Sequence, residues 1–152
     1  MLEAFGMSDP GCVRTNNEDY FVLAPSMDLF LVADGMGGAL AGEHASRLAG
    51  ETVLEYLKTA EERNPDTLLQ AIAEANRKVL RAADSDPQFH GMGTTLTAAM
   101  RVNDELILAN VGDSRAYWLR AESADGTGNA PSQRLSSDDS WAQALVDAGA
   151  MD

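Results

Sequence analysis

The sequence is poor in cysteine and in basic residues, and each shortage excludes a class of protein. Cys12 is the single cysteine, so an internal disulfide framework and a cysteine-rich zinc site are both excluded. The 152 residues include 11 Lys or Arg against 24 Asp or Glu, which gives a net charge of −13 at pH 7. A chain this acidic repels nucleic-acid phosphates and anionic lipid headgroups. We therefore expect no nucleic-acid partner.

Long apolar runs are also lacking. No run approaches the roughly 18 residues that a membrane-spanning helix needs, and residues 1–10 (MLEAFGMSDP) lack the basic start and apolar core of a signal peptide. We expect no membrane span and a reducing, cytoplasmic setting. Hydrophobic residues nevertheless make up 45% of the chain, which is too many for a disordered protein and enough for the core of one domain.

The spacing of apolar residues predicts strands on both sides of a central pair of helices. Strands are predicted at residues 19–24, 29–33, 94–102, 105–111 and 115–119. Helices are predicted from residue 43 to about 62 and, with Asn64 as the N-cap, from 65 to about 84. The expected apolar face of the second helix is Leu69, Ile72, Asn76, Val79, Leu80 and Ala83. Because strands flank two consecutive helices, the order favours an α+β fold with antiparallel sheets and helices packed on one side.

Smaller elements complete this prediction. Residues 103–104 (ND) suit a tight hairpin between two of the strands. Residues 121–132 are polar and glycine-rich, which predicts an exposed loop, and a last short helix is expected over residues 141–148.

Three segments combine acidic residues with glycine at the ends of predicted strands. They are residues 11–19 (GCVRTNNED), 33–38 (ADGMGG) and 110–115 (NVGDSR). Mg²⁺ and Mn²⁺ prefer carboxylate and carbonyl oxygens as ligands, and Gly35 has no side chain to keep a metal from its carbonyl. Taken singly, each segment is more often an ordinary turn than a metal site, and Arg14 alone is most simply an exposed surface residue.

In combination and in order, the segments resemble the metal-dependent serine/threonine protein phosphatases of the PP2C (PPM) family, in particular its bacterial branch. The matching segments are residues 11–19, 32–46, 91–96, 110–117 and 135–140, so the resemblance covers essentially the whole chain. It implies a single domain over residues 1–152, an antiparallel β-sandwich flanked by helices in α-β-β-α layers. The later strands, flap and Asp-Gly and Asp-Asn motifs of the family have no counterpart here, so we interpret the chain as the N-terminal portion of such a domain.

The resemblance also implies a metal and phosphate site. Asp34 would bridge two Mn²⁺ or Mg²⁺ ions, and the Gly35 carbonyl would bind one of them. Asp113 matches the ligand of a third, weaker ion, and Arg14 matches the phosphate-binding arginine. The implied catalytic residues are Arg14 and Asp34, and the implied metal ligands are Glu18, Asp19, Asp34, Gly35 and Asp113.

The implied reaction is hydrolysis of phosphoserine and phosphothreonine in proteins by a metal-bridging water, with Arg14 holding two phosphate oxygens. The partner would be a phosphorylated protein, with a serine/threonine kinase acting in the opposite direction. The alternative is a catalytically inactive, phosphatase-like binding module or fragment. It is motivated by the missing later aspartates and by Ala39 and Asp139, which stand where family members often carry histidine. A generic phosphoryl-binding α/β domain fits less well, because no P-loop or dinucleotide fingerprint is present.

Overall fold

The computed structural model describes residues 2–13, 15–119, 132–140, 143–144 and 147–149. Short 3₁₀ turns lie at Pro25–Met27 and Pro87–Phe89. The helices and strands are, in chain order, β1 (Asp19–Ala24), β2 (Leu29–Met36), α1 (Ala39–Thr59), α2 (Pro65–Ser85), β3 (Gly93–Thr94), β4 (Leu96–Val102), β5 (Glu105–Val111), β6 (Tyr117–Leu119) and β7 (Ser132–Arg134).

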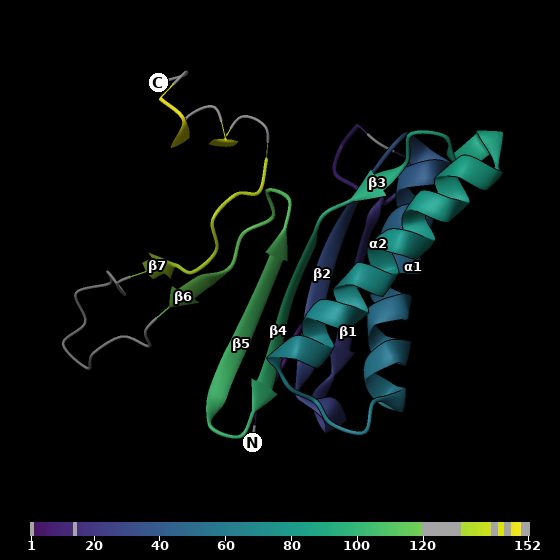
Figure 1. Cartoon of the computed structure of the whole chain (residues 1–152). Helices are drawn as coiled ribbons and strands as arrows, with labels where there is room; N and C mark the ends of the chain where they lie inside the picture. The colour runs from purple at the N-terminus through teal and green to yellow at the C-terminus, as the bar shows by residue number, and fades with distance from the viewer. Residues whose placement is uncertain (1, 14, 120–131, 141–142, 145–146, 150–152) are drawn as a thin grey trace.

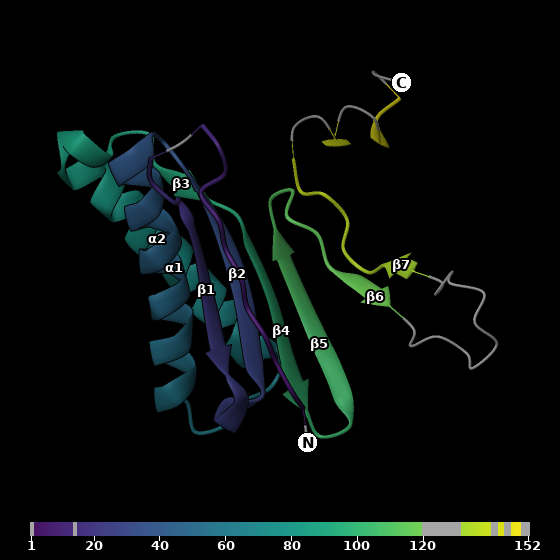
Figure 2. The ribbon, with the colours of Figure 1, turned by 180° about the vertical axis from the view of Figure 1, so that it is seen from behind.

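The main sheet has five strands, and every pairing in it is antiparallel. Its order is β1-β2-β4-β5, and the short β3 pairs with the end of β2. Both helices lie on one face of this sheet, while β6 and β7 form a separate two-stranded sheet beyond β5 (Figures 1 and 2). Antiparallel sheets with two helices confirm the expected α+β class.

The core lies between the main sheet and the helices. In β2, residues Leu29, Leu31 and Ala33 are buried and alternate with more exposed ones, as a half-covered strand requires. The facing side of α1 includes Ala45 and Val53, both fully buried. Because much of this helix face is alanine, the helix backbone can approach the strands closely.

The second helix is turned relative to its expected orientation. Its buried residues are Leu68, Ala71, Ala75 and Val79, whereas Leu69 and Leu80 are 60% and 55% exposed. The prediction of its apolar face was therefore wrong for the two leucines. The physical reason is that α2 packs against α1, and small alanines let two helices come together where leucines would hold them apart.

The element boundaries differ from the predicted ones mainly around glycine and threonine. Helix α1 begins at Ala39 instead of residue 43, directly after Gly37 (φ 121°) and Gly38 (φ 93°). These positive φ values suit glycine alone, so the chain turns from β2 into the helix at once. The strand expected over 94–102 is divided into β3 and β4 on either side of Thr95. Strand β6 begins at Tyr117, two residues later than expected.

Several local predictions are confirmed. The Asn64 side chain accepts a hydrogen bond from the Thr67 N–H (2.9 Å) and caps α2. Strands β4 and β5 are joined by a two-residue turn, in which Asn103 has a φ of 56°. Most of the loop expected at 121–132 and part of the helix expected at 141–148 lie outside the described residues. Of the helices within the described ranges, none is long and apolar enough to cross a bilayer.

The sheet face opposite the helices carries exposed apolar side chains. Phe21, Leu23 and Val32 are 36%, 39% and 50% exposed on this face. The N-terminal segment runs beside it (Figure 2), and its Gly6 backbone lies against the Phe21 ring. We call this side of the sheet, opposite the helices, the outer face. The candidate site lies at one end of it.

Candidate metal site at one end of the sheet

Two of the predicted ligands, Asp19 and Asp34, lie directly opposite each other across β1 and β2. Directly opposed residues of an antiparallel pair point to the same face of a sheet. Asp34 alternates with the buried Ala33 and Gly35, so the shared face is the outer one. Two carboxylates on the same face of a strand pair supply the oxygen ligands that a divalent cation takes.

A hollow of about 250 Å³ opens beside the two carboxylates. It brings together four polar residues from separate segments and a set of apolar ones. The lining is Met7, Ser8, Asp19, Tyr20, Phe21, Val32, Ala33, Asp34 and Ser114. Carboxylates beside an open, solvent-accessible hollow suit an ion such as Mn²⁺ or Mg²⁺, which takes oxygen ligands and keeps several waters.

Asp19 is held by a closed set of three hydrogen bonds. The Ser8 hydroxyl donates to Asp19 Oδ2 (3.0 Å) and accepts from Asn17 Nδ2 (2.7 Å). The Asp19 N–H in turn donates to Asn17 Oδ1 (3.0 Å). Such contacts fix the direction of a carboxylate before any ligand arrives, which is the usual role of groups around a metal ligand.

The backbone of Asp34 is fixed by the Thr94-Thr95 pair. The Asp34 N–H donates to Thr95 Oγ1 (3.0 Å). Its carbonyl accepts from the Thr95 N–H (2.9 Å) and from the Thr94 hydroxyl (3.0 Å). The end of β2 is thereby held in place although β3 is only two residues long.

Glu18 and Gly35 lie at the contact between β2 and the first turn of α1. The Gly35 N–H donates to the Glu18 carbonyl (3.0 Å), and the Ser46 hydroxyl donates to the same carbonyl (2.6 Å). Gly35 and Gly42 touch so closely that a Cβ on Gly35 would overlap the Gly42 carbonyl. The Glu18 carboxylate lies beside Gly42, so Glu18 is on the helix side of the sheet, and Asp19 and Asp34 are on the outer face.

The remaining predicted residues are placed differently. Asp113 is exposed in the turn between β5 and β6, and its neighbour Ser114 lines the hollow. Arg14 lies outside the described residues. Among the described residues, no group of three or more His, Cys, Asp or Glu side chains is arranged to hold a metal ion. The described part of the site thus pairs Asp19 with Asp34, and neither Glu18 nor Asp113 completes a group of three with them.

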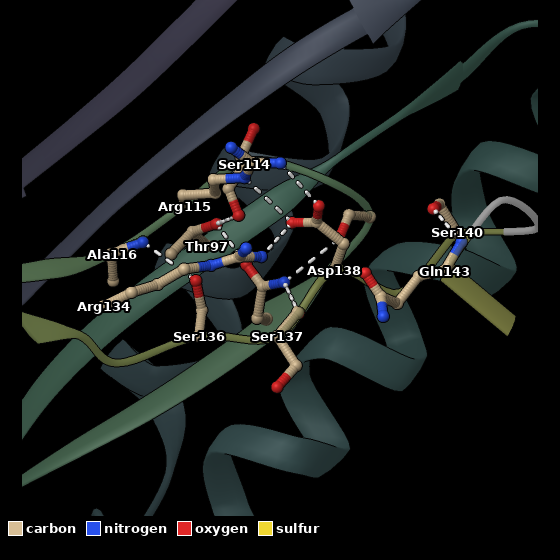
Figure 3. Close-up of polar contacts among 12 residues, drawn as sticks. Thr97, Ser114, Arg115, Ala116, Arg134, Ser136, Ser137, Asp138, Ser140 and Gln143 are labelled. Carbon is tan, nitrogen blue, oxygen red and sulfur yellow. Dashed lines mark hydrogen bonds and ion pairs between the residues drawn. The ribbon is translucent and has the colours of Figure 1, made fainter. Parts of the chain in front are cut away.

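A network of polar contacts joins the turn that carries Asp113 to residues 135–139 (Figure 3). Asp138 accepts hydrogen bonds from Arg115 Nε (3.2 Å) and Nη2 (2.8 Å), and it also pairs with Arg134. The hydrogen bonds from Arg115, and the charges of both guanidinium groups, lower the pKa of Asp138. The same pair raises the pKa of Arg115. Asp138 is therefore ionised at neutral pH.

Sequence reasoning missed the hydroxyl residues of the site. Ser8, Thr95 and Ser114 touch the predicted ligands or line the hollow. Serine and threonine occur throughout the chain, so composition gives no reason to select these three. For two of them a signal was present, because Thr95 lies in the matching segment 91–96 and Ser114 in 110–117; Ser8 lies in no matching segment.

Comparison with known proteins assigns the chain to a family. The family model described as "Protein phosphatase 2C" matches residues 13–138. The chain therefore belongs to the protein phosphatase 2C family.

Curated and solved relatives support this assignment. A serine/threonine phosphatase stp of Listeria innocua is 40% identical over 123 residues, which covers 74% of this chain and 48% of that protein. The crystal structure of Stp1 from Staphylococcus aureus has a TM-score of 0.82 at 29% identity and covers 99% of this chain and 59% of that one. The structure of the PstP catalytic domain with two manganese ions has a TM-score of 0.77 at 36% identity, covering 95% and 59%. The chain spans about half the length of the first curated relatives that it matches.

Proposed function

We propose that residues 1–152 form part of a phosphatase domain that hydrolyses phosphoserine and phosphothreonine in proteins with the help of Mn²⁺ or Mg²⁺. The observation that carries this proposal is the pair of opposed carboxylates, Asp19 and Asp34, beside a hollow on the outer face. Family membership supports it, as does the relative PstP, whose catalytic domain binds two manganese ions.

In this proposal each predicted residue keeps its role. Asp34 and the Gly35 carbonyl would hold the ions. When bound, the ions lower the pKa of a water molecule and offset negative charge on the phosphate. The further proposed metal ligands are Asp19, Glu18 and Asp113.

The residues around the site hold the proposed metal ligands in position. The backbone of Asp34 is fixed by the Thr95 hydroxyl and main chain, which sets the position from which its carboxylate extends. The Ser8 hydroxyl keeps Asp19 turned in one direction. Arg14 would donate two parallel hydrogen bonds to the phosphate, which orients the group and balances its charge.

The test is phosphate release from a phosphothreonine peptide by the purified chain, with Mn²⁺ and with EDTA. We expect release with Mn²⁺ and none with EDTA. Asp34→Asn keeps the size of the side chain but removes its charge, and it should abolish release. Asp104→Asn, in the exposed β4–β5 turn, is the matched control and should behave as the unmodified chain. Release that survives Asp34→Asn would contradict the proposed role.

A second candidate is a phosphatase-like module that binds phosphoproteins without turnover. The observation in its favour is that no three potential ligand side chains converge within the described ranges. This candidate predicts saturable binding of a phosphothreonine peptide, no phosphate release, and weaker binding for Arg14→Ala. Binding by calorimetry together with the release assay separates the two candidates. In either case the partner is a phosphorylated protein, and the proposed opposing activity is a serine/threonine kinase.

A further inference from the structure

The turn that carries Asp113 is held from its far side by a later segment of the chain. We call residues 112–116 the turn and residues 135–139 the clasp. The Asp139 N–H donates to the Gly112 carbonyl (2.8 Å), and the Ala116 N–H donates to Ser136 Oγ (2.9 Å). The clasp therefore binds the backbone at both ends of the turn, with Asp113 between the two points.

Asp138 supplies the charged part of the clasp. Its side chain is 10% exposed, and its two oxygens receive the guanidinium groups of Arg115 and Arg134 (Figure 3). Both oxygens are thus occupied, which leaves Asp138 poorly placed to bind anything else. Hydrogen bonds between ionised partners are shorter and stronger than neutral ones, so this pair adds a charged contact to the two backbone contacts between the turn and the clasp.

On its near side, the turn is joined to Asp34. The Ser114 and Thr95 hydroxyls are 2.8 Å apart, and the Asp34 N–H donates to the same Thr95 oxygen. A chain of hydrogen bonds thus runs from the end of β2 through Thr95 to Ser114, the residue next to Asp113. The turn is held between Thr95 and the clasp.

We propose that Asp138 is a positioning residue, which holds Arg115 so that the turn keeps Asp113 at the same end of the sheet as Asp34. The proposal rests on the proposed function, because it concerns the ligand role of Asp113. Nothing in it requires Asp138 to touch an ion or a phosphate. Loss of its charge would leave Arg115 without its carboxylate and release the turn from one side.

The test compares Asp138→Asn with a control that removes an equivalent ion pair elsewhere. Asp28 accepts from Arg101 Nε (3.1 Å) and Nη2 (2.7 Å) at the opposite end of β2. Asp28→Asn therefore removes a similar Arg–Asp pair, and asparagine tolerates the positive φ of 51° at that position. Amide hydrogen exchange at Ala116 and Asp139, whose N–H groups join the turn and the clasp, should quicken about tenfold or more in Asp138→Asn and stay unchanged in Asp28→Asn.

A second measurement separates positioning from general destabilisation. Mg²⁺, which is diamagnetic, is titrated into the chain carrying ¹³C-labelled aspartate, and the side-chain carboxyl chemical shifts of Asp34 and Asp113 are followed. In the unmodified chain and in Asp28→Asn, both carboxyl groups should shift. In Asp138→Asn, the shift of Asp113 should need about tenfold more Mg²⁺, while the shift of Asp34 is unchanged.

The outcomes are distinct. Equal Mg²⁺ dependence of the Asp113 shift in the unmodified chain and in Asp138→Asn overturns the positioning role, even if exchange quickens. A shift at Asp34 with none at Asp113 in any variant also overturns it, because Asp113 then meets no ion. Absence of a shift at Asp34 overturns the proposed function itself, so the two failures are distinguishable.

Discussion

Replacing Gly35 by alanine tests whether the contact between β2 and α1 is as close as the structure shows. An added Cβ at this position would overlap the Gly42 carbonyl and lie 2.8 Å from the Glu18 carbonyl oxygen. Both are backbone atoms, so no side-chain rotation relieves the overlap. The strand must move away from the helix, and the hydrogen bond from the Gly35 N–H to the Glu18 carbonyl (3.0 Å) lengthens with it.

The expected cost follows from these two effects. Forcing an extra carbon into a packed contact costs about 1–3 kcal/mol, and a lost hydrogen bond adds about 1 kcal/mol. Alanine recovers about 0.4–1 kcal/mol by restricting the unfolded chain. We therefore expect Gly35→Ala to lower the free energy of unfolding by about 2–3 kcal/mol, which for a chain of this size lowers Tm by about 5–10 °C.

Gly93→Ala is the matched control, because Gly93 lies in β3 beside the same end of β2. A Cβ there meets the Met36 side chain at 2.7 Å, and its next contact is 3.5 Å away. Met36 is 64% exposed and flexible at its tip, so it can turn aside. Urea and thermal unfolding followed by circular dichroism should show Gly93→Ala close to the unmodified chain. Equal stabilities for Gly35→Ala and Gly93→Ala would refute the reasoning.

Three further predictions concern the core, a helix cap and an ion pair. Leu68→Ala removes an α2 side chain with 1% exposure and should cost about 3 kcal/mol in urea unfolding, whereas Leu69→Ala, at 60% exposure, should cost under about 1 kcal/mol; similar costs would contradict the orientation of α2. Asn64→Ala removes the acceptor of the Thr67 N–H (2.9 Å) and should lower the free energy of unfolding by about 1 kcal/mol. An unchanged urea midpoint would contradict this prediction. The pKa of Asp138 is lowered in the fold by Arg115, so the stability from this group is complete above its ordinary value of 3.8 and is lost as pH falls through the lowered pKa. Tm measured from pH 7 to pH 2.5 should therefore fall less steeply on the acid side in Asp138→Asn than in the unmodified chain, and parallel curves would contradict this.

The parts of the fold that were predictable are those with local causes. Asn64 and Pro65 fix the start of α2 through one side-chain acceptor and one pre-set φ angle, and both act within a single turn. The two-residue turn at Asn103 and Asp104 likewise has a local cause, because asparagine tolerates the positive φ that Asn103 adopts there. Such signals remain visible in sequence because no distant residue is needed to produce them.

The orientation of α2 could not be predicted in this way. Helical periodicity selected Leu69 and Leu80 because leucine is the more hydrophobic choice, but the buried face uses Ala71 and Ala75. What decided the outcome was the neighbouring helix α1, whose Ala49 is buried near Ala75 of α2. Close packing of two small-residue faces outweighs the burial of two leucines here, and periodicity within one helix contains no information about the shape of the other.

The same difference between local and distant causes applies to the candidate site. Asp19 and Asp34 were predicted from motif and strand pattern, and the structure places them opposite each other. Their supports come from residues 11 and 61 positions away, namely Ser8 and Thr95. Thr95 donates its N–H to the Asp34 carbonyl and accepts the Asp34 N–H on its hydroxyl, so it acts as a strand partner although it lies in no strand. Geometry therefore explains a motif residue that has no reacting atom: Thr95 lies between β3 and β4 and holds both the N–H and the carbonyl of Asp34.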